Sequence, residues 1–324
     1  MTVQTQEQGR LLCVVGPTAS GKSALAVALA EGLDGEILSC DSMQLYRGMD
    51  IGTAKAAPDE QKGIVHHFLD ILDIHEAFSV SDYVTLAEQT VTDLYARHKT
   101  PIFCGGTGLY VDSFVSGMSF EEQNIRPGLR EELTEQALRD GEDVLHARLA
   151  ALDPVCAAAI QPQNVKRVVR ALEICLSTGE PMSVWQERAR QKAKPRNAVY
   201  ICLSFADRQK LYERIDQRVD SMMANGLLEE AESLFCAGLR DTPTAGQAIG
   251  YKEFYPYFDG NAALEECVER LKINSRHYAK RQLTWFGRNK AAHFLMVDEM
   301  SPNELLKSAF EVWEHTNDAG GGEA

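Results

Sequence analysis

The feature that most constrains this chain is the string GPTASGKS at 16–23, which fits the phosphate-binding pattern GxxxxGK[ST] in full. The apolar run LLCVV at 11–15 precedes it, and an Ala- and Leu-rich segment from Lys22 to about Glu31 follows it. The pattern predicts a buried strand, a glycine-rich loop and a helix that stops at Gly32. A strand, loop and helix in this order are the opening unit of a parallel sheet, so the sequence predicts a P-loop.

A loop of this kind binds phosphate through backbone and side chain together. Its glycines let backbone N–H groups curl around phosphate oxygens, and the start of the helix adds roughly half a positive charge. Lys22 supplies a full charge and Ser23 supplies a hydroxyl for Mg²⁺. We therefore expect a diphosphate or polyphosphate to be held by Gly16, Pro17, Thr18, Ala19, Ser20, Gly21, Lys22 and Ser23. Because the loop recognises phosphates and not the group attached to them, a small-molecule kinase remains an alternative.

Four further apolar runs, at 36–41, 101–106, 198–205 and 293–297, predict the other strands of the sheet. In an open parallel sheet the ligand site lies beyond the carboxyl ends of the strands, where Asp41, Thr107 and the P-loop should converge. Some eighty residues with a helical pattern separate the third and fourth predicted strands. The predicted fold class is α/β, with a P-loop NTPase-like core and a mainly parallel sheet at 10–117 and 197–300. An all-helical insertion is expected at 118–196, and disorder at 1–9 and 317–324.

Composition narrows the function. A formal net charge of -14 argues against a general nucleic-acid coat protein, which must neutralise many phosphates at once. No apolar run approaches the roughly 18 residues that cross a bilayer, and the polar start MTVQTQEQGR lacks the features of a signal peptide. We expect a cytoplasmic protein without a membrane partner. The 8 cysteines show no CxxC spacing, which favours free buried thiols over a zinc site.

Two stretches are basic in spite of the acidic total. One runs from Arg270 to Lys290 without an acidic residue and is interleaved with aromatic side chains, and the other covers 188–196. A solvated helix face is the simpler interpretation of either stretch alone. Together they favour a polyanionic partner.

Eight strings occur in an order and spacing that resemble the tRNA dimethylallyltransferase family, over about 11–290. They are GPTASGKS, DSMQLYRGMDIGTAK, HHFLDI, GGTGLY, QNVKRVVRALE, RIDQRVDSMM, GQAIGYKE and YAKRQLTWF. The resemblance implies transfer of a dimethylallyl group from dimethylallyl diphosphate to the exocyclic amine of the adenosine next to the anticodon of tRNA. The P-loop would then hold the diphosphate of the prenyl donor, with Mg²⁺ at Ser23, in a monomer that binds the anticodon stem-loop.

The resemblance also implies roles for individual residues. Asp41 matches the general base, Thr107 lies near the leaving oxygen, and Arg218 lines the reaction channel. Contacts with tRNA are implied for Asp41, Ser42, Met43, Gln44, Thr107, Arg130, Gln163, Asn164, Val165, Lys166 and Arg167. The helical insertion and the basic stretch that ends at Lys290 would hold the anticodon stem-loop. No Cys/His ligand set follows Trp285, which fits the shorter bacterial form of the family.

Several residues keep a simpler interpretation. Asp41 could cap a helix, and Arg218 could form a surface ion pair with Glu213, Asp216 or Asp220. Trp285 and Phe286 could be core aromatics or a platform on which a base stacks. The adjacent His66 and His67 point to different sides of a strand and make a poor metal pair, so they are structural or line the substrate.

Three other activities remain open on the sequence. An adenylate isopentenyltransferase would act on free AMP, ADP or ATP and would not need a long helical insertion. A P-loop kinase would transfer a phosphoryl group, and a P-loop RNA-binding protein would leave its RNA unchanged.

Overall fold

The computed structural model describes residues 9–118 and 125–318. Two compact units emerge from it: the first comprises Met1–Val115 and Arg196–Ala324, and the second is Ser116–Pro195. In the part of the second unit that is described, the regular elements are all helices, and the limits of the unit lie beside the 118 and 196 that were expected for the insertion. Its helices are α4 (Leu129–Asp140), α5 (Glu142–Leu152), α6 (Pro154–Ala159), α7 (Val165–Thr178) and α8 (Met182–Lys192).

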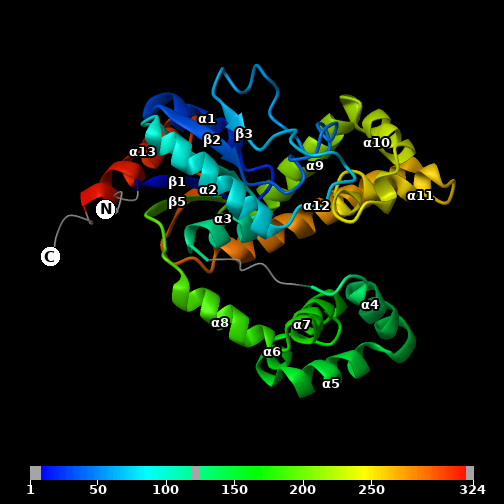
Figure 1. The fold of residues 1–324 in the computed structure, drawn as a ribbon. Coiled ribbons are helices and arrows are strands. Elements are labelled where there is room, and N and C mark those ends of the chain that lie inside the picture. The colour runs from blue at the N-terminus through cyan, green and yellow to red at the C-terminus, as the bar shows by residue number, and fades with distance from the viewer. Residues whose placement is uncertain (1–8, 119–124, 319–324) are drawn as a thin grey trace. The chain divides into compact units, whose positions relative to one another are not determined.

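The first unit is built on one sheet of six parallel strands in the order β3-β2-β4-β1-β5-β6 (Figure 1). The strands are β1 (Leu11–Val15), β2 (Gly35–Ser39), β3 (His66–His67), β4 (Thr100–Gly105), β5 (Ala198–Ser204) and β6 (Ala292–Met296). All residues of β1 are fully buried, as befits a central strand that is covered on both faces. The predicted α/β class and parallel sheet are confirmed.

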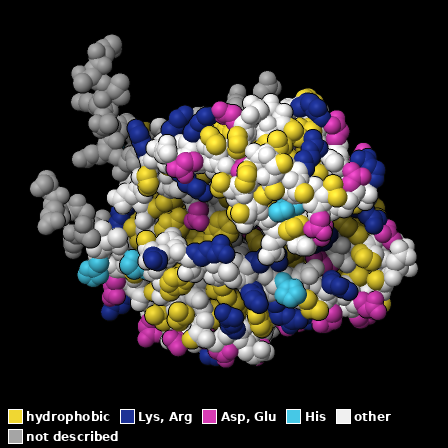
Figure 2. All heavy atoms as spheres, turned by 90° about the horizontal axis from the view of Figure 1, so that it is seen from below, with side chains coloured by type: hydrophobic (Ala, Val, Ile, Leu, Met, Phe, Trp, Pro, Cys, Tyr) yellow, Lys and Arg dark blue, Asp and Glu magenta, His cyan; other side chains and the backbone are white. Residues whose placement is uncertain are grey.

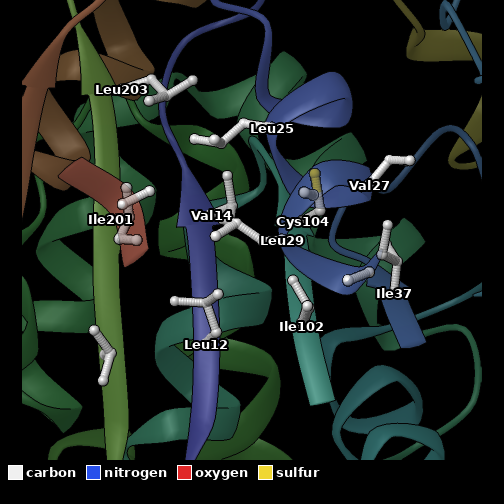
Figure 3. Packing of buried hydrophobic residues seen from close by; sticks show 14 of the residues in the cluster. Leu12, Val14, Leu25, Val27, Leu29, Ile37, Ile102, Cys104, Ile201 and Leu203 are labelled. Atoms are coloured by element: carbon white, nitrogen blue, oxygen red, sulfur yellow. The ribbon is translucent and has the colours of Figure 1, made fainter. Parts of the chain in front are cut away.

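The first unit also contains α-helices, several of which pack against the sheet. They are α1 (Lys22–Leu33), α2 (Val80–Ala96), α3 (Gly108–Val115), α9 (Arg208–Ala224), α10 (Leu227–Cys236), α11 (Tyr255–Phe258), α12 (Leu264–Phe286) and α13 (Pro302–Asp318). Three short 3-10 turns lie at Leu239–Asp241, Ala245–Gln247 and Lys252–Phe254. Alternation along the strands sends Leu12 and Val14 to one face, where they pack with Leu25 and Leu29 of α1 (Figure 3). On the other face Phe103 of β4 stacks on Phe114 of α3, with ring centroids 4.8 Å apart.

The helix after the P-loop does not stop at Gly32, as the sequence analysis expected. It continues to Leu33 and ends where Asp34 adopts a left-handed conformation, with φ 48°. Gly32 is instead a contact point, because an added Cβ would lie 2.5 Å from the Phe310 ring of α13. The glycine lets α13 lie against α1.

Three other expectations need correction. Helix α13 runs to Asp318, so 317 and 318 are helical, while 1–8 and 319–324 lie outside the described residues. Gly9 is placed against α2, where its carbonyl accepts a 2.7 Å hydrogen bond from the Tyr95 hydroxyl. All eight cysteines are free, but Cys236 is exposed and only the others are buried.

Of the helices in the described ranges, none is long and apolar enough to cross a membrane.

Candidate active site

The P-loop joins β1 to α1 and contains two positions at which only glycine fits. Gly16 has φ 138°, and an added Cβ would lie 2.5 Å from the carbonyl oxygen of Leu203 in β5. Gly21 has φ 88° and stands immediately before α1. Both glycines are therefore required for the loop to leave the sheet and turn into the helix.

Inside the loop, two side chains bond to one carbonyl. Lys22 Nζ donates to the Pro17 carbonyl oxygen at 2.6 Å, and the buried Ser20 hydroxyl donates to the same oxygen at 2.8 Å. Burial lowers the pKa of Lys22 to about 8. A desolvated ammonium group is stabilised by a nearby anion, so the lysine is placed to favour phosphate in the adjoining cavity.

A cavity of about 590 Å³ opens beside the P-loop. Residues after three different strands border it: the loop itself after β1, Asp41 after β2, and Gly106 after β4. The α-helical part of its wall includes Arg218 of α9 together with Tyr278 and Gln282 of α12. The carboxyl edge of the sheet therefore brings the P-loop and Asp41 to one cavity, as predicted, and Arg218 joins them there from α9.

A second cavity, of about 250 Å³, adjoins the first. The two share Thr18, Asp41, Thr53, Arg218 and Tyr278. Much of the remaining wall is apolar and comprises Ile215, Val219, Met222, Ala248, Ile249 and Leu271. A carboxylate and a guanidinium thus stand where the P-loop cavity meets a less polar one, as a reaction between two bound molecules requires.

Asp41 does not cap a helix, because no helix begins in the segment between β2 and β3. Its Oδ1 accepts a 2.9 Å hydrogen bond from the backbone N–H of Met43, which shapes the turn that follows the strand. The half-buried carboxylate lines both cavities. The helix-cap interpretation of Asp41 is therefore wrong.

Thr107 lies just beyond β4 and contacts the Asp41 segment. Its hydroxyl accepts a 3.2 Å hydrogen bond from the N–H of Ser42, and its own N–H donates to the Cys40 carbonyl at 2.9 Å. The close approach depends on Gly105, where an added Cβ would lie 2.4 Å from the carbonyl carbon of Cys40. Thr107 is thus joined to the turn that holds Asp41, although its neighbour Gly106, and not Thr107, forms the cavity wall.

Arg218 faces the cavities, whereas its possible surface partners Asp216 and Asp220 bind other cations. Asp216 accepts from Arg276 at 2.7 Å, and Asp220 lies 2.7 Å from Lys272, both on α12. Burial lowers the pKa of Arg218, with Asp41 and then Glu60 as the opposing charges. The surface ion-pair interpretation is not supported for Arg218.

The expected tRNA contacts after β2 divide into two groups. Ser42 and Met43 line the second cavity. Gln44 lines the first cavity and is also a structural link, since its Oε1 accepts from the Ser39 hydroxyl at 3.1 Å and its Nε2 donates to the Thr53 carbonyl at 3.2 Å. Both polar atoms of the Gln44 amide are therefore engaged in hydrogen bonds that hold the loop at Thr53.

The other expected tRNA contacts belong to the second unit. Gln163, Asn164, Lys166 and Arg167 are exposed around the start of α7, with Val165 half-buried between them. Arg130 of α4 donates two hydrogen bonds to Glu173 of α7, at 3.1 and 2.7 Å. Nearly all of the Glu173 side chain is buried, so the guanidinium of Arg130 is held by a fixed carboxylate.

Two site residues escaped the sequence analysis. Gln282 is buried, accepts from the Thr18 N–H at 2.8 Å and donates to the Gly106 carbonyl at 3.0 Å. Tyr278, one helical turn earlier, lines both cavities, and burial raises its pKa to about 12. Both lie in the string YAKRQLTWF, but no spacing rule separates them from other polar residues of an amphipathic helix.

The aromatic and histidine side chains take mainly structural positions. Phe286 is buried and is a core aromatic, whereas Trp285 is half-buried and its Nε1 donates a 2.6 Å hydrogen bond to Asp112. His67 pairs with Glu36 at 2.7 Å. His66 bonds to the Ile64 carbonyl at 2.9 Å and lines the first cavity.

Both basic stretches are partly neutralised within their own units. Lys272 and Arg276 bind acids of α9, while Arg188 pairs with Glu180 at 2.7 Å and Arg196 with Glu88. On the face shown in Figure 2, acidic side chains are spread among the basic ones. The stretches therefore offer less free positive charge to a polyanion than their sequences indicate.

Comparison with known proteins identifies the family. The model of the family described as IPP transferase matches residues 44–290. A tRNA dimethylallyltransferase of Bacillus subtilis (strain 168) is 51% identical over 306 residues, which cover 94% of this chain and 96% of the relative. One from Geobacillus thermodenitrificans (strain NG80-2) is 50% identical over the same shares of both chains.

Solved structures agree in fold. The full-length tRNA isopentenylpyrophosphate transferase from Bacillus halodurans is 43% identical, with a TM-score of 0.69 over 96% of both chains. A eukaryotic dimethylallyltransferase acting on tRNA is 28% identical, with a TM-score of 0.76 over 89% of this chain and 74% of that one. The P-loop, the parallel sheet and these similarities together show that the chain belongs to the IPP transferase family.

Proposed function

We propose that this chain transfers a dimethylallyl group from dimethylallyl diphosphate to the exocyclic amine of the adenosine next to the anticodon in tRNA, and releases diphosphate. The observation that carries the proposal is the meeting of the two cavities at Asp41 and Arg218. Two of the similar proteins are named tRNA dimethylallyltransferase. We propose further that the protein works as a monomer in the cytoplasm.

The prenyl donor occupies the P-loop cavity in this proposal. Its diphosphate accepts hydrogen bonds from loop amides and from Lys22, which turns from the Pro17 carbonyl to the anion. Arg218 lies across the same cavity and stabilises the negative charge that develops as the allylic C–O bond breaks. Donor binding and leaving-group stabilisation therefore share one set of cations.

Magnesium fits this site as a companion of the diphosphate. Ser23 is exposed at the start of α1 and lines the cavity. Within 9–118 and 125–318 no group of three His, Cys, Asp or Glu side chains could hold a metal alone. Mg²⁺ commonly binds through few protein ligands with water and substrate phosphates, so a single hydroxyl suits it. Ser23 would hold the ion, which would neutralise charge on the phosphate oxygens.

The acceptor adenosine enters from the second cavity. Its exocyclic amine is a weak nucleophile because the lone pair is delocalised into the ring, so a base must remove a proton as the C–N bond forms. Asp41 borders both cavities and takes that proton, a role worth roughly 10² to 10⁴ in rate. Thr107 stabilises the Asp41 segment through its hydrogen bond with the N–H of Ser42. In this proposal its hydroxyl also forms a hydrogen bond near the leaving oxygen.

The remaining contacts with tRNA are proposed for residues of both units, half-buried in the first unit and mostly exposed in the second. Ser42 and Met43 contact the nucleotide at the second cavity, and Gln44, which lines the first cavity, holds the adjoining loop at Thr53. Arg130 and the segment from Gln163 to Arg167 contact the anticodon stem-loop from the second unit. Arg130 is suited to a phosphate because Glu173 fixes its guanidinium while leaving 56% of the side chain exposed.

The decisive experiment supplies labelled dimethylallyl diphosphate and Mg²⁺ and compares tRNA, AMP and buffer as acceptors, with ATP consumption measured in parallel. Label in tRNA supports the proposal. Label in AMP alone would assign an adenylate isopentenyltransferase, and ATP consumption without label transfer would assign a kinase. Binding of tRNA without any change in its mass would leave only an RNA-binding protein.

A further inference from the structure

A single carboxamide links the two loops at the phosphate cavity. Gln282 Oε1 accepts the N–H of Thr18 in the P-loop, and its Nε2 donates to the carbonyl of Gly106 after β4. The partners lie 264 and 176 positions away from Gln282 in the chain. Only 4% of Gln282 is exposed, so water cannot readily replace either bond.

The geometry requires this side chain. One partner is a donor and the other an acceptor, so the bridging group must offer an oxygen to the first and an N–H to the second. The position is also tightly bounded, because an added Cβ at Gly106 would lie 1.9 Å from Gln282 Nε2. A shorter carboxamide would not reach both loops, and an apolar side chain would leave two buried backbone groups unbonded.

The two loops carry different parts of the proposed reaction. Thr18 borders both cavities, and Gly106 stands next to Thr107, whose hydroxyl receives the N–H of the residue after Asp41. Because Thr18 uses its N–H on Gln282, this amide orients the loop and does not bind the anion. The carboxamide of Gln282 therefore fixes the distance between the P-loop, which binds the diphosphate in the proposed function, and the segment that carries Asp41.

The same helix is anchored on both sides of this link. Trp285 donates to Asp112 of α3 at 2.6 Å, and Arg276 donates to Asp216 of α9, two residues before Arg218. Helix α12 thus contacts the P-loop, the turn after β4 and the helix of the cavity arginine.

We infer that Gln282 is a positioning residue, which holds the P-loop and the Thr107 turn in the register that the transfer needs. The inference rests on the proposed function, since register matters only if a donor in the P-loop reacts with a group near Asp41. Positioning errors of about 1 Å can cost roughly 10²-fold in rate. Donor affinity should change little, because Lys22 and the other loop amides remain.

The test compares Gln282→Met, of similar length, and Gln282→Asn, which keeps the amide but loses reach, with the unmodified protein. We expect kcat for transfer to tRNA to fall about 10- to 100-fold in both, while the Kd for inorganic pyrophosphate stays within about threefold. Gln209→Met, at an exposed position of α9, is the matched control and should keep full activity. Thermal unfolding is followed for each variant so that rates are compared well below the midpoint.

A lower unfolding midpoint with unchanged kcat would make Gln282 purely structural and overturn the inference.

The energetic coupling between Gln282 and Thr107 gives a second criterion. If Gln282 acts through the Thr107 turn, Gln282→Met combined with Thr107→Val should lose less than the product of the single losses, whereas fully multiplicative losses would contradict it. Failure of the unmodified protein to label tRNA would sink the proposed function instead, so the two failures are distinguishable.

Discussion

At the scale of single residues, Asp41 combines a chemical and a conformational role. Its Oδ1 holds the turn through the N–H of Met43, and an asparagine oxygen could accept the same bond. Asp41→Asn should therefore keep the turn and remove the base. We expect the single-turnover transfer rate to fall by roughly 10²- to 10⁴-fold, with pyrophosphate affinity nearly unchanged. Asp241→Asn, at an exposed turn, is the control, and a fully active Asp41→Asn would remove this residue as the base.

Lys22 makes the anion site sensitive to pH. Its folded-state pKa of about 8 lies below the ordinary lysine value because burial disfavours the charged form. Above that pH the amine is neutral, whereas a bound diphosphate favours the ammonium, so binding takes up a proton and weakens as pH rises through 8. Calorimetry with pyrophosphate between pH 7 and 9.5 should show this weakening.

The reference for this pH profile is Lys22→Met, which removes the titrating amine. It should bind pyrophosphate more weakly at pH 7 and with a flatter profile. Identical profiles for the two proteins would contradict the assignment of the pH dependence to Lys22.

At the scale of elements, the contact between α1 and α13 depends on the missing side chain of Gly32. Alanine would favour the helix by about 1 kcal/mol, but its Cβ would meet the Phe310 ring at 2.5 Å. Overpacking typically costs about 1 to 3 kcal/mol, so we expect Gly32→Ala to lower the free energy of unfolding. Urea denaturation measures it, and adding Phe310→Leu should recover part of the loss. A stabilised single variant would mean that helix propensity outweighs packing here.

At the scale of the whole molecule, the second unit should be removable. The backbone N–H of Arg196 donates to the Val115 carbonyl at 2.8 Å, so the ends of the insertion are adjacent in the first unit. Replacing 116–195 with a short glycine and serine linker should leave a folded P-loop unit that binds pyrophosphate within about threefold. Transfer to tRNA should be lost, because the proposed contacts at Arg130 and 163–167 are gone. Retained transfer in this variant would exclude the second unit from tRNA binding.

The sequence predicted the parts of this molecule that follow from local pattern. Strands β1, β2, β4, β5 and β6 correspond to apolar runs, whereas β3 has two residues and no such run. The rule for parallel sheets brought Asp41 to the P-loop correctly. Side-chain partners over long separations were not accessible: the link from Gln282 to Thr18 spans 264 positions, and the sequence could not exclude an ion pair between Arg218 and Asp216 or Asp220. The sequence predicted that Gly32 ends the helix, whereas the glycine makes room for Phe310, a partner too far along the chain for local pattern to indicate.

The hydrogen bond between Arg196 and Val115 also bears on how the chain folds. Strand β5 can pair with β1 only after the chain has passed through the second unit, Ser116–Pro195, an interruption on the order of 80 residues, and closing a flexible loop costs more free energy as its length increases. The second unit has its own hydrophobic cluster around Leu149 and Leu172, so it can collapse locally. Once the second unit has collapsed, its two ends are close together, so the chain between Val115 and Arg196 behaves as a short connection. An interruption of this size therefore slows nucleation of the central sheet far less than an unstructured spacer of equal length.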